Sequence, residues 1–165
     1  MTLYIDNSTI FNNSDFPCCN FNGKFTGIPR TVYNLSKNIK KLYPRVKFCV
    51  FNDKTCKFYL INFEDNKLIT DVIFHKDDVI FTAGATWSFA NYNNVILDLK
   101  KIGVKYFQCF HDLIPTIFPY FYEDGKDFGS YFESWCKQSF SLCDGAYSVS
   151  ECSKNDMVKI FDLQK

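Results

Sequence analysis

Two hydrophobic periods alternate along this chain, and the alternation restricts its fold more than any other feature of the sequence. Short runs rich in aromatic and β-branched residues are typical of buried strands, whereas apolar residues spaced three or four positions apart are typical of helices. Strands that alternate with helices predict a doubly wound α/β fold, with a mostly parallel sheet and helices on both faces. The runs that we interpret as strands are 3–5, 46–51, 57–61, 79–85, 104–110 and 145–149.

The predicted helices lie between these strands. Pro29 suits the first turn of a helix, and Pro44 ends the apolar pattern that starts there. Gly103 fits a helix C-cap, and Ser150 fits an N-cap. The polar residues at 52–55 indicate a turn between two strand-like runs, so the runs would be consecutive strands, with a hairpin as one arrangement left open. The helical segments are 28–42, 91–102, 128–142 and 150–161, and a long loop is expected over 7–26.

Length and composition indicate one folded domain over residues 1–165. With 47% hydrophobic and 19% aromatic residues, the chain is too apolar to be disordered. Nineteen basic and eighteen acidic residues leave no basic stripe that follows a phosphate backbone, so we expect no nucleic-acid partner. The chain shows neither a signal sequence nor a run near the ~20 apolar residues of a membrane span, so we expect a cytoplasmic protein, with the inner face of the membrane as an alternative.

The eight cysteines predict neither a disulfide framework nor a metal site. Disulfide-rich folds are short secreted chains with regular cysteine spacing, whereas here an adjacent pair, Cys18 and Cys19, is followed by scattered single cysteines. Zinc sites need paired thiolates or imidazoles at defined spacing. We therefore expect free thiols and no bound metal.

A histidine and an aspartate follow the predicted strand at 104–110. Ligands of doubly wound sheets bind beyond the carboxyl ends of the strands, so His111 and Asp112 are candidate catalytic residues. A neutral imidazole can stabilise positive charge or accept a hydrogen bond, and the alternative is a structural histidine that caps the loop. Asp112 would either orient the imidazole or hold the turn at 113–115 through backbone amides.

The starts of two predicted helices supply further candidates. Gly27 would let a phosphate approach the amides and positive dipole of a helix N-terminus, and Arg30 would pair with that phosphate. A tight turn and a solvated surface arginine are the alternatives. Ser150 and Glu151 begin the last helix at the edge of the cleft, where Ser150 and Ser153 offer hydroxyls, although capping alone explains Ser150.

Aromatic residues are concentrated after the histidine and aspartate. Aromatic faces stack on sugar rings or cover an acceptor lipid, whereas packing of the helix at 128–142 accounts for at least half of these residues. We assign Trp87 and Tyr120 to the acceptor or the cleft edge, and His75 to no role. The group consists of Tyr120, Phe121, Tyr122, Tyr131, Phe132 and Trp135.

An ordered set of motifs resembles the N-terminal domain of family 4 glycosyltransferases. The motifs match in order and spacing, and a further segment is similar to that family's strand-to-helix turn. The resemblance runs from the first strand to nearly the last residue. The motifs are TGIPRTVYNL at 26–35, HDLIP at 111–115 with Pro119 after Phe118, and VSECSKND at 149–156; the further segment is AGATWSF at 83–89.

The resemblance implies a retaining GT-B enzyme, in which two Rossmann-like domains face each other across a cleft. The first domain holds mainly the acceptor and the second mainly the nucleotide-sugar, which is a co-substrate, and no metal or other cofactor is implied. On this interpretation the chain is the acceptor-side half of a hexosyltransferase that acts on a hydroxyl of a cell-surface glycan, of polysaccharide or lipopolysaccharide type. The donor domain is outside this chain, and without it we expect no turnover.

Two other interpretations stay open. The chain would also suit a stand-alone acceptor-binding or non-catalytic subunit that recruits a separate donor domain. An unrelated doubly wound binding module is the third possibility, because a fold alone does not fix a function. The partners expected under the first interpretation are the donor domain, in the same chain or a separate subunit, and a glycan or lipid-linked acceptor, with peripheral membrane association left open.

Overall fold

The computed structural model describes residues 1–11, 27–122 and 125–162, which contain a seven-stranded sheet. The strand order is β4-β3-β2-β1-β5-β6-β7. Strands β1, β2, β5, β6 and β7 are parallel, and β3 and β4 extend the sheet in antiparallel fashion. The strands are β1 (Leu3–Asp6), β2 (Lys47–Asn52), β3 (Lys57–Asn62), β4 (Lys67–Asp71), β5 (Val79–Thr82), β6 (Lys105–Phe110) and β7 (Gly145–Ser148).

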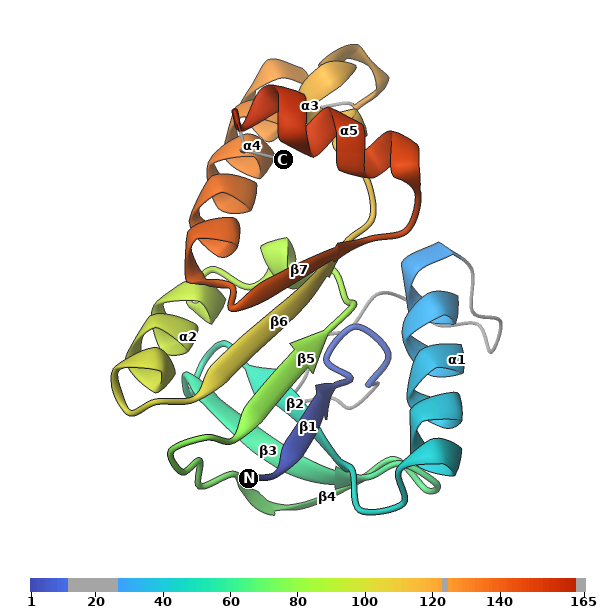
Figure 1. The fold of residues 1–165 in the computed structure, drawn as a ribbon, viewed down its shortest axis with the longest axis vertical. Coiled ribbons are helices and arrows are strands. Elements are labelled where there is room, and N and C mark those ends of the chain that lie inside the picture. The colour runs from blue at the N-terminus through green and yellow to red at the C-terminus, as the bar shows by residue number, and fades with distance from the viewer. Residues whose placement is uncertain (12–26, 123–124, 163–165) are drawn as a thin grey trace.

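Helices flank the sheet on two sides, so the doubly wound α/β fold expected from the sequence is confirmed (Figure 1). Helix α1 lies on one side, α2 and α4 lie on the other, and α3 and α5 lie beyond the carboxyl ends of the strands. No helix among the described segments is long and apolar enough to cross a membrane. The helices are α1 (Gly27–Leu42), α2 (Tyr92–Lys101), α3 (Ile114–Ile117), α4 (Gly125–Leu142) and α5 (Glu151–Ile160), with short 3-10 turns η1 (Thr86–Ser88) and η2 (Pro119–Phe121).

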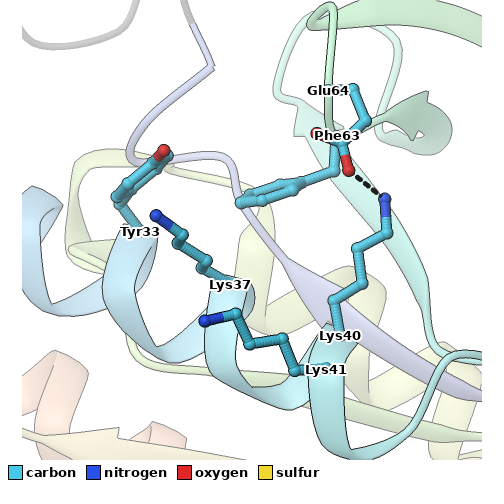
Figure 2. A pocket seen from close by; sticks show the side chains of 6 residues that line it. All are labelled: Tyr33, Lys37, Lys40, Lys41, Phe63 and Glu64. Atoms are coloured by element: carbon cyan, nitrogen blue, oxygen red, sulfur yellow. Dashed lines mark hydrogen bonds and ion pairs between the residues drawn. The ribbon is translucent and has the colours of Figure 1, made fainter.

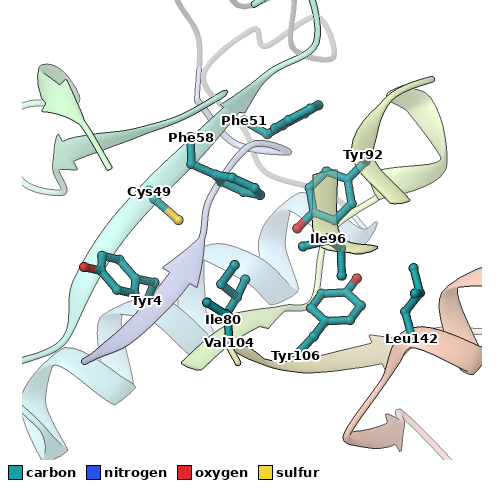
Figure 3. Packing of buried hydrophobic residues seen from close by; sticks show 10 residues of the cluster. All are labelled: Tyr4, Cys49, Phe51, Phe58, Ile80, Tyr92, Ile96, Val104, Tyr106 and Leu142. Carbon is teal, nitrogen blue, oxygen red and sulfur yellow. The ribbon is translucent and has the colours of Figure 1, made fainter. Parts of the chain in front are cut away.

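Neighbouring residues of β1 explain how one strand supports two helical layers. Tyr4 packs in the cluster that holds Tyr92 and Ile96 of α2 (Figure 3). Ile5, the next residue, packs in a cluster that contacts Ile39 of α1. Since side chains alternate across a strand, a continuous apolar run buries both faces, as in parallel sheets generally. This arrangement is what the run at 3–5 predicted.

Several local predictions are also confirmed. Strands β2 and β3 are consecutive, as expected, and form a hairpin, with Phe51 opposite Phe58. Gly103 follows α2 with a positive φ of +89°, as a C-cap glycine does. The Ser150 hydroxyl accepts a hydrogen bond from the Ser153 amide at 3.1 Å and so caps α5.

The structure also adds elements that the sequence interpretation lacked. All five residues of β4 are exposed, so this edge strand carries no buried residue that would mark it. The loop predicted after His111 contains α3 and η2, and α4 begins at Gly125, three residues before the predicted start at 128. Most of the loop expected over 7–26 lies outside the described residues. The six described cysteines are free thiols, and Cys18 and Cys19 lie outside the described residues.

A buried carboxylate ties the end of β1 to helix α2. Asp6, at the end of β1, is only 1% exposed. Its carboxylate accepts hydrogen bonds from the Ser8 amide at 2.8 Å, from the Ser8 hydroxyl, and from the Tyr92 hydroxyl at 2.6 Å. Burial raises the pKa of Asp6, and these hydrogen bonds oppose that rise because they favour the charged form.

We expect Tyr92→Phe to destabilise the protein in a pH-dependent way. The lost hydroxyl stabilises the charged Asp6 carboxylate, so the substitution raises the folded-state pKa of Asp6 further. Stability that depends on a raised pKa is present below the unfolded value of about 3.9 and is lost as pH rises through the folded value. The deficit should therefore be smallest at acid pH, where Asp6 is protonated in both proteins, and should grow as pH rises through the raised folded-state pKa of Asp6, to about 1.5–3 kcal/mol, measured by urea unfolding over a series of pH values.

Tyr106→Phe is the matched control. Tyr106 is as deeply buried as Tyr92, but its hydroxyl donates to the neutral Gln108 side chain. Its deficit should stay constant over the same pH range. A deficit that is equally constant for Tyr92→Phe would show that Asp6 is not the partner that matters.

Candidate functional site

The candidate site lies where the strand order of the sheet reverses. The chain leads from β1 to β2 on one side of β1, whereas β5 lies on the other side. The connections therefore diverge at the carboxyl ends of β1 and β5, where doubly wound sheets bind their ligands. Helix α1 runs back along the sheet from β1, so its first turn lies at the same end (Figure 1).

The loops after β1 and β5 interlock at this point. The Thr9 hydroxyl accepts a hydrogen bond from the Ala85 amide at 2.8 Å. A Cβ atom at Gly84 would overlap the Thr9 hydroxyl, so the close approach of the two loops requires glycine there. The small residues at 83–85, which end the predicted strand, thus serve this approach of one loop to the other.

His111 follows β6 and is held from both ends. Its Nε2 atom lies 2.7 Å from the carbonyl oxygen of Ala83, and its own carbonyl accepts a hydrogen bond from the Ser153 hydroxyl at 2.7 Å. A carbonyl oxygen only accepts, so Nε2 must carry the hydrogen. The ring is half-buried, and among the described residues nothing hydrogen-bonds to Nδ1. In the neutral imidazole, Nδ1 therefore stays available as an acceptor.

Asp112 holds the turn that follows it. Its Oδ1 atom accepts a hydrogen bond from the Ile114 amide at 3.0 Å, the two-residue spacing of an Asx turn. In the part of the chain that the structure describes, no hydrogen bond joins Asp112 to His111. Of the two roles expected for Asp112, the hydrogen bond to the Ile114 amide corresponds to holding the turn at 113–115.

The buried thiol of Cys136 lies near this carboxylate and is unreactive. Burial raises the pKa of the Cys136 thiol to about 12, and the charges of Asp112 and Glu133 add to the rise. A thiol in that state is protonated at neutral pH and is a poor nucleophile. Among the described residues, no group of three or more histidine, cysteine or acidic side chains could hold a metal ion.

The other predicted residues lie at two helix starts. Gly27 is exposed, has φ of +56° and would meet no atom within 4 Å if it carried a Cβ, so its backbone conformation alone favours glycine. Arg30 is exposed and forms no ion pair with any described residue. Glu151 is exposed and lies 3.5 Å from Lys154, one turn later on α5. The proposed contacts of these residues with a ligand stay predictions.

The aromatic residues divide into packed and exposed groups. The ring of Trp87 packs edge-on against Phe132 at 5.1 Å and Trp135 at 5.4 Å between centroids, so helix packing accounts for it. Tyr120 and Phe121 are 72% and 69% exposed. Their rings contact each other and the ring of Phe118, and with the exposed Tyr122 that follows they form what we call the aromatic strip: Phe118, Tyr120, Phe121 and Tyr122.

Comparison with family models, curated proteins and solved structures finds no match for this chain. The resemblance to family 4 glycosyltransferases therefore stays a prediction. What the structure brings together is His111, the Ala83 carbonyl and Ser153 of α5, with the aromatic strip following in sequence. Ser153 takes the contact with His111, whereas Ser150 is occupied by its capping bond.

The hydrogen bond to Ala83 fixes the tautomer that we expect for His111. Nitrogen-15 NMR of the neutral imidazole should show a protonated Nε2 and an unprotonated Nδ1, because the carbonyl oxygen accepts only from N–H. His75 is the internal control, since it is exposed and no described residue hydrogen-bonds to its ring. Its shifts should be those of a mixture of tautomers. A protonated Nδ1 at His111 would contradict the assignment.

Proposed function

We propose that this chain is the acceptor-side half of a retaining GT-B hexosyltransferase, with His111 at the reacting centre. The intact enzyme would move a hexose from a nucleotide-sugar to a hydroxyl of a cell-surface glycan. The sequence motifs around Gly27, His111 and Ser150 support the family. The doubly wound sheet is compatible with it, although such a fold hosts many functions.

One observation carries the catalytic part of the proposal. The Nε2 atom of His111 is occupied by Ala83, and no described residue binds Nδ1. The imidazole is thus oriented by a main-chain bond and keeps one nitrogen for a ligand. At the carboxyl end of a strand, that nitrogen would accept a hydrogen bond from a sugar hydroxyl or, as the cation, donate one to developing negative charge.

The aromatic strip would meet the acceptor. Exposed rings stack on the apolar faces of sugars and cover lipid chains, and touching rings provide a broad rigid surface for either ligand. Since the ring of Trp87 is already packed, Tyr120 and Phe121 take this role in the proposal. The strip follows the turn that Asp112 holds, so its position depends on the same loop as His111.

The nucleotide-sugar would be held mainly by a second domain. Gly27 and Arg30 at the start of α1 offer a backbone N-terminus and one cation to its phosphates, and neither residue is bound to His111. A single glycine is a weak phosphate site compared with a glycine-rich loop. This half of the site would therefore supply only a small part of the donor affinity.

Substitution of His111 separates a catalytic role from a structural one. In the complete enzyme, His111→Ala should lower kcat by roughly 10²-fold, the range typical of a positioned acid, base or charge-stabilising group. It should also lower the unfolding free energy by about 1 kcal/mol, because the bond to Ala83 is lost. Steady-state kinetics and thermal unfolding measure the two effects on one preparation.

His111→Gln is the matched control. The glutamine amide nitrogen can replace Nε2 as donor to Ala83, but glutamine has no counterpart of Nδ1. Stability should recover and kcat should not. If kcat recovers together with stability, His111 has only a structural role.

A second prediction concerns the nucleotide-sugar itself. This chain alone should bind nucleotide-sugars in the millimolar range, near −4 kcal/mol, because the donor domain supplies most of their contacts in the proposal. Isothermal titration calorimetry with several nucleotide-sugars tests this expectation. Micromolar affinity for any of them would place the donor site in this chain and overturn the division between acceptor and donor halves.

A further inference from the structure

Positive charge is concentrated in one segment of the chain. Between Gly27 and Asn52 the sequence has six of its nineteen basic residues and none of its eighteen acidic residues, so the remainder has thirteen basic residues against eighteen acidic ones. Such asymmetry within a nearly neutral protein indicates an anionic partner for the basic part. The six residues are Arg30, Lys37, Lys40, Lys41, Arg45 and Lys47.

A pocket of about 300 Å³ lies in this basic region. Helix α1 forms one wall, and the turn between β3 and β4 forms the other (Figure 2). It is distinct from the site at His111, because the second half of α1 and the start of β2 lie toward the amino ends of the parallel strands. The lining residues are Tyr33, Lys37, Lys40, Lys41, Phe63 and Glu64.

Two of the three lysines in the pocket retain uncompensated charge. Lys40 pairs with Glu64 at 2.5 Å, which neutralises both groups. Lys37 and Lys41 form no ion pair within the described part of the chain, and both are exposed. Figure 2 shows their ammonium groups on the side of the pocket away from the Lys40–Glu64 pair. The pocket therefore presents two positive charges to a ligand.

A fixed aromatic ring stands beside these charges. The ring of Phe63 stacks on Phe48 at 4.6 Å and on Tyr33 at 5.8 Å between centroids. The Lys40 ammonium lies 5.9 Å from the centre of the same ring. Phe48 is buried, so Phe63 is held from behind by the core. A rigid ring of this kind is a good surface for a flat or apolar group.

We propose that this pocket binds a phosphate monoester whose attached group packs against Phe63. A phosphate monoester carries about −1.5 to −2 charges at pH 7, which matches the two charges of Lys37 and Lys41. Ammonium groups donate strong charge-assisted hydrogen bonds to phosphate oxygens. The proposal is independent of the glycosyltransferase assignment, since none of its residues takes part in the site at His111.

The phosphate could come from a soluble compound or from a lipid headgroup. Leu42, next to Lys41, is 86% exposed, and Tyr43 after it is also exposed. An exposed leucine and tyrosine beside lysines would enter the interface of a membrane that carries phosphate monoester lipids. A soluble ligand would need only the pocket. The two sources are distinguished by presenting each one separately.

The soluble arm uses inorganic phosphate and phenyl phosphate, titrated into the full chain by calorimetry. Phenyl phosphate should bind more tightly, because its ring meets Phe63, and Phe63→Leu should remove that preference. Lys37→Gln together with Lys41→Gln should weaken binding roughly tenfold or more. Lys54→Gln together with Lys159→Gln is the control, since both lysines are exposed and neither forms an ion pair within the described segments.

The lipid arm uses vesicles of phosphatidylcholine with and without phosphatidic acid, in a flotation assay with the same variants. Binding that requires phosphatidic acid, Lys37 and Lys41 would support the pocket with a lipid as its ligand, and binding in the soluble arm alone would support a soluble ligand. The proposal is overturned if neither arm shows binding. It is also overturned if the Lys37 and Lys41 pair and the control pair weaken binding equally.

Discussion

The carboxylate of Asp6 is the constraint on which the centre of this fold depends. It stands at the end of β1 and takes hydrogen bonds from the amide and hydroxyl of Ser8 and from the Tyr92 hydroxyl of α2. The Ser8 hydroxyl in turn accepts from the Phe51 amide of β2 at 2.7 Å. This network therefore joins β1 to β2, to the covering helix α2 and to the loop that meets Gly84. A buried carboxylate is tolerated only when its donors are in place, so the group enforces this arrangement.

The fold could be predicted because each core strand and helix has a recognisable pattern in its own stretch of sequence. Runs such as 46–51 bury consecutive residues on both faces of the sheet, and that burial explains why they are apolar. Strand β4 escaped prediction because every one of its residues is exposed, and it exists through its pairing with β3. Helix α3 escaped because it is one turn long and contains a proline at its start, a composition that also suits a loop.

For the candidate site, the sequence predicted where single residues lie relative to strands and helices, but not which residues contact each other. That His111 follows a buried strand can be seen in the sequence, but its two partners are 28 and 42 residues away. The neighbouring sequence does not indicate which imidazole nitrogen of His111 binds the Ala83 carbonyl. It also does not indicate that the Asp112 carboxylate accepts a hydrogen bond from the Ile114 amide. The basic segment in α1 is likewise visible as charge, whereas the ring that completes its pocket comes from the turn after β3. Contacts between residues that are distant in the sequence are set by the sheet topology and cannot be read from composition.

The hydrogen bond from the Ser153 hydroxyl to the His111 carbonyl means that α5 helps to position His111. The N-cap and first turn of α5 carry both the capping serine and the serine that holds His111, so the position of the helix is coupled to the position of the His111 backbone. A partner that shifts α5 on binding would also shift the loop that carries His111, and by linkage that partner and a ligand of His111 would alter each other's affinity by the same factor. In the proposed enzyme, the outer face of α5 would thus be a surface at which a partner alters the site at the end of β6.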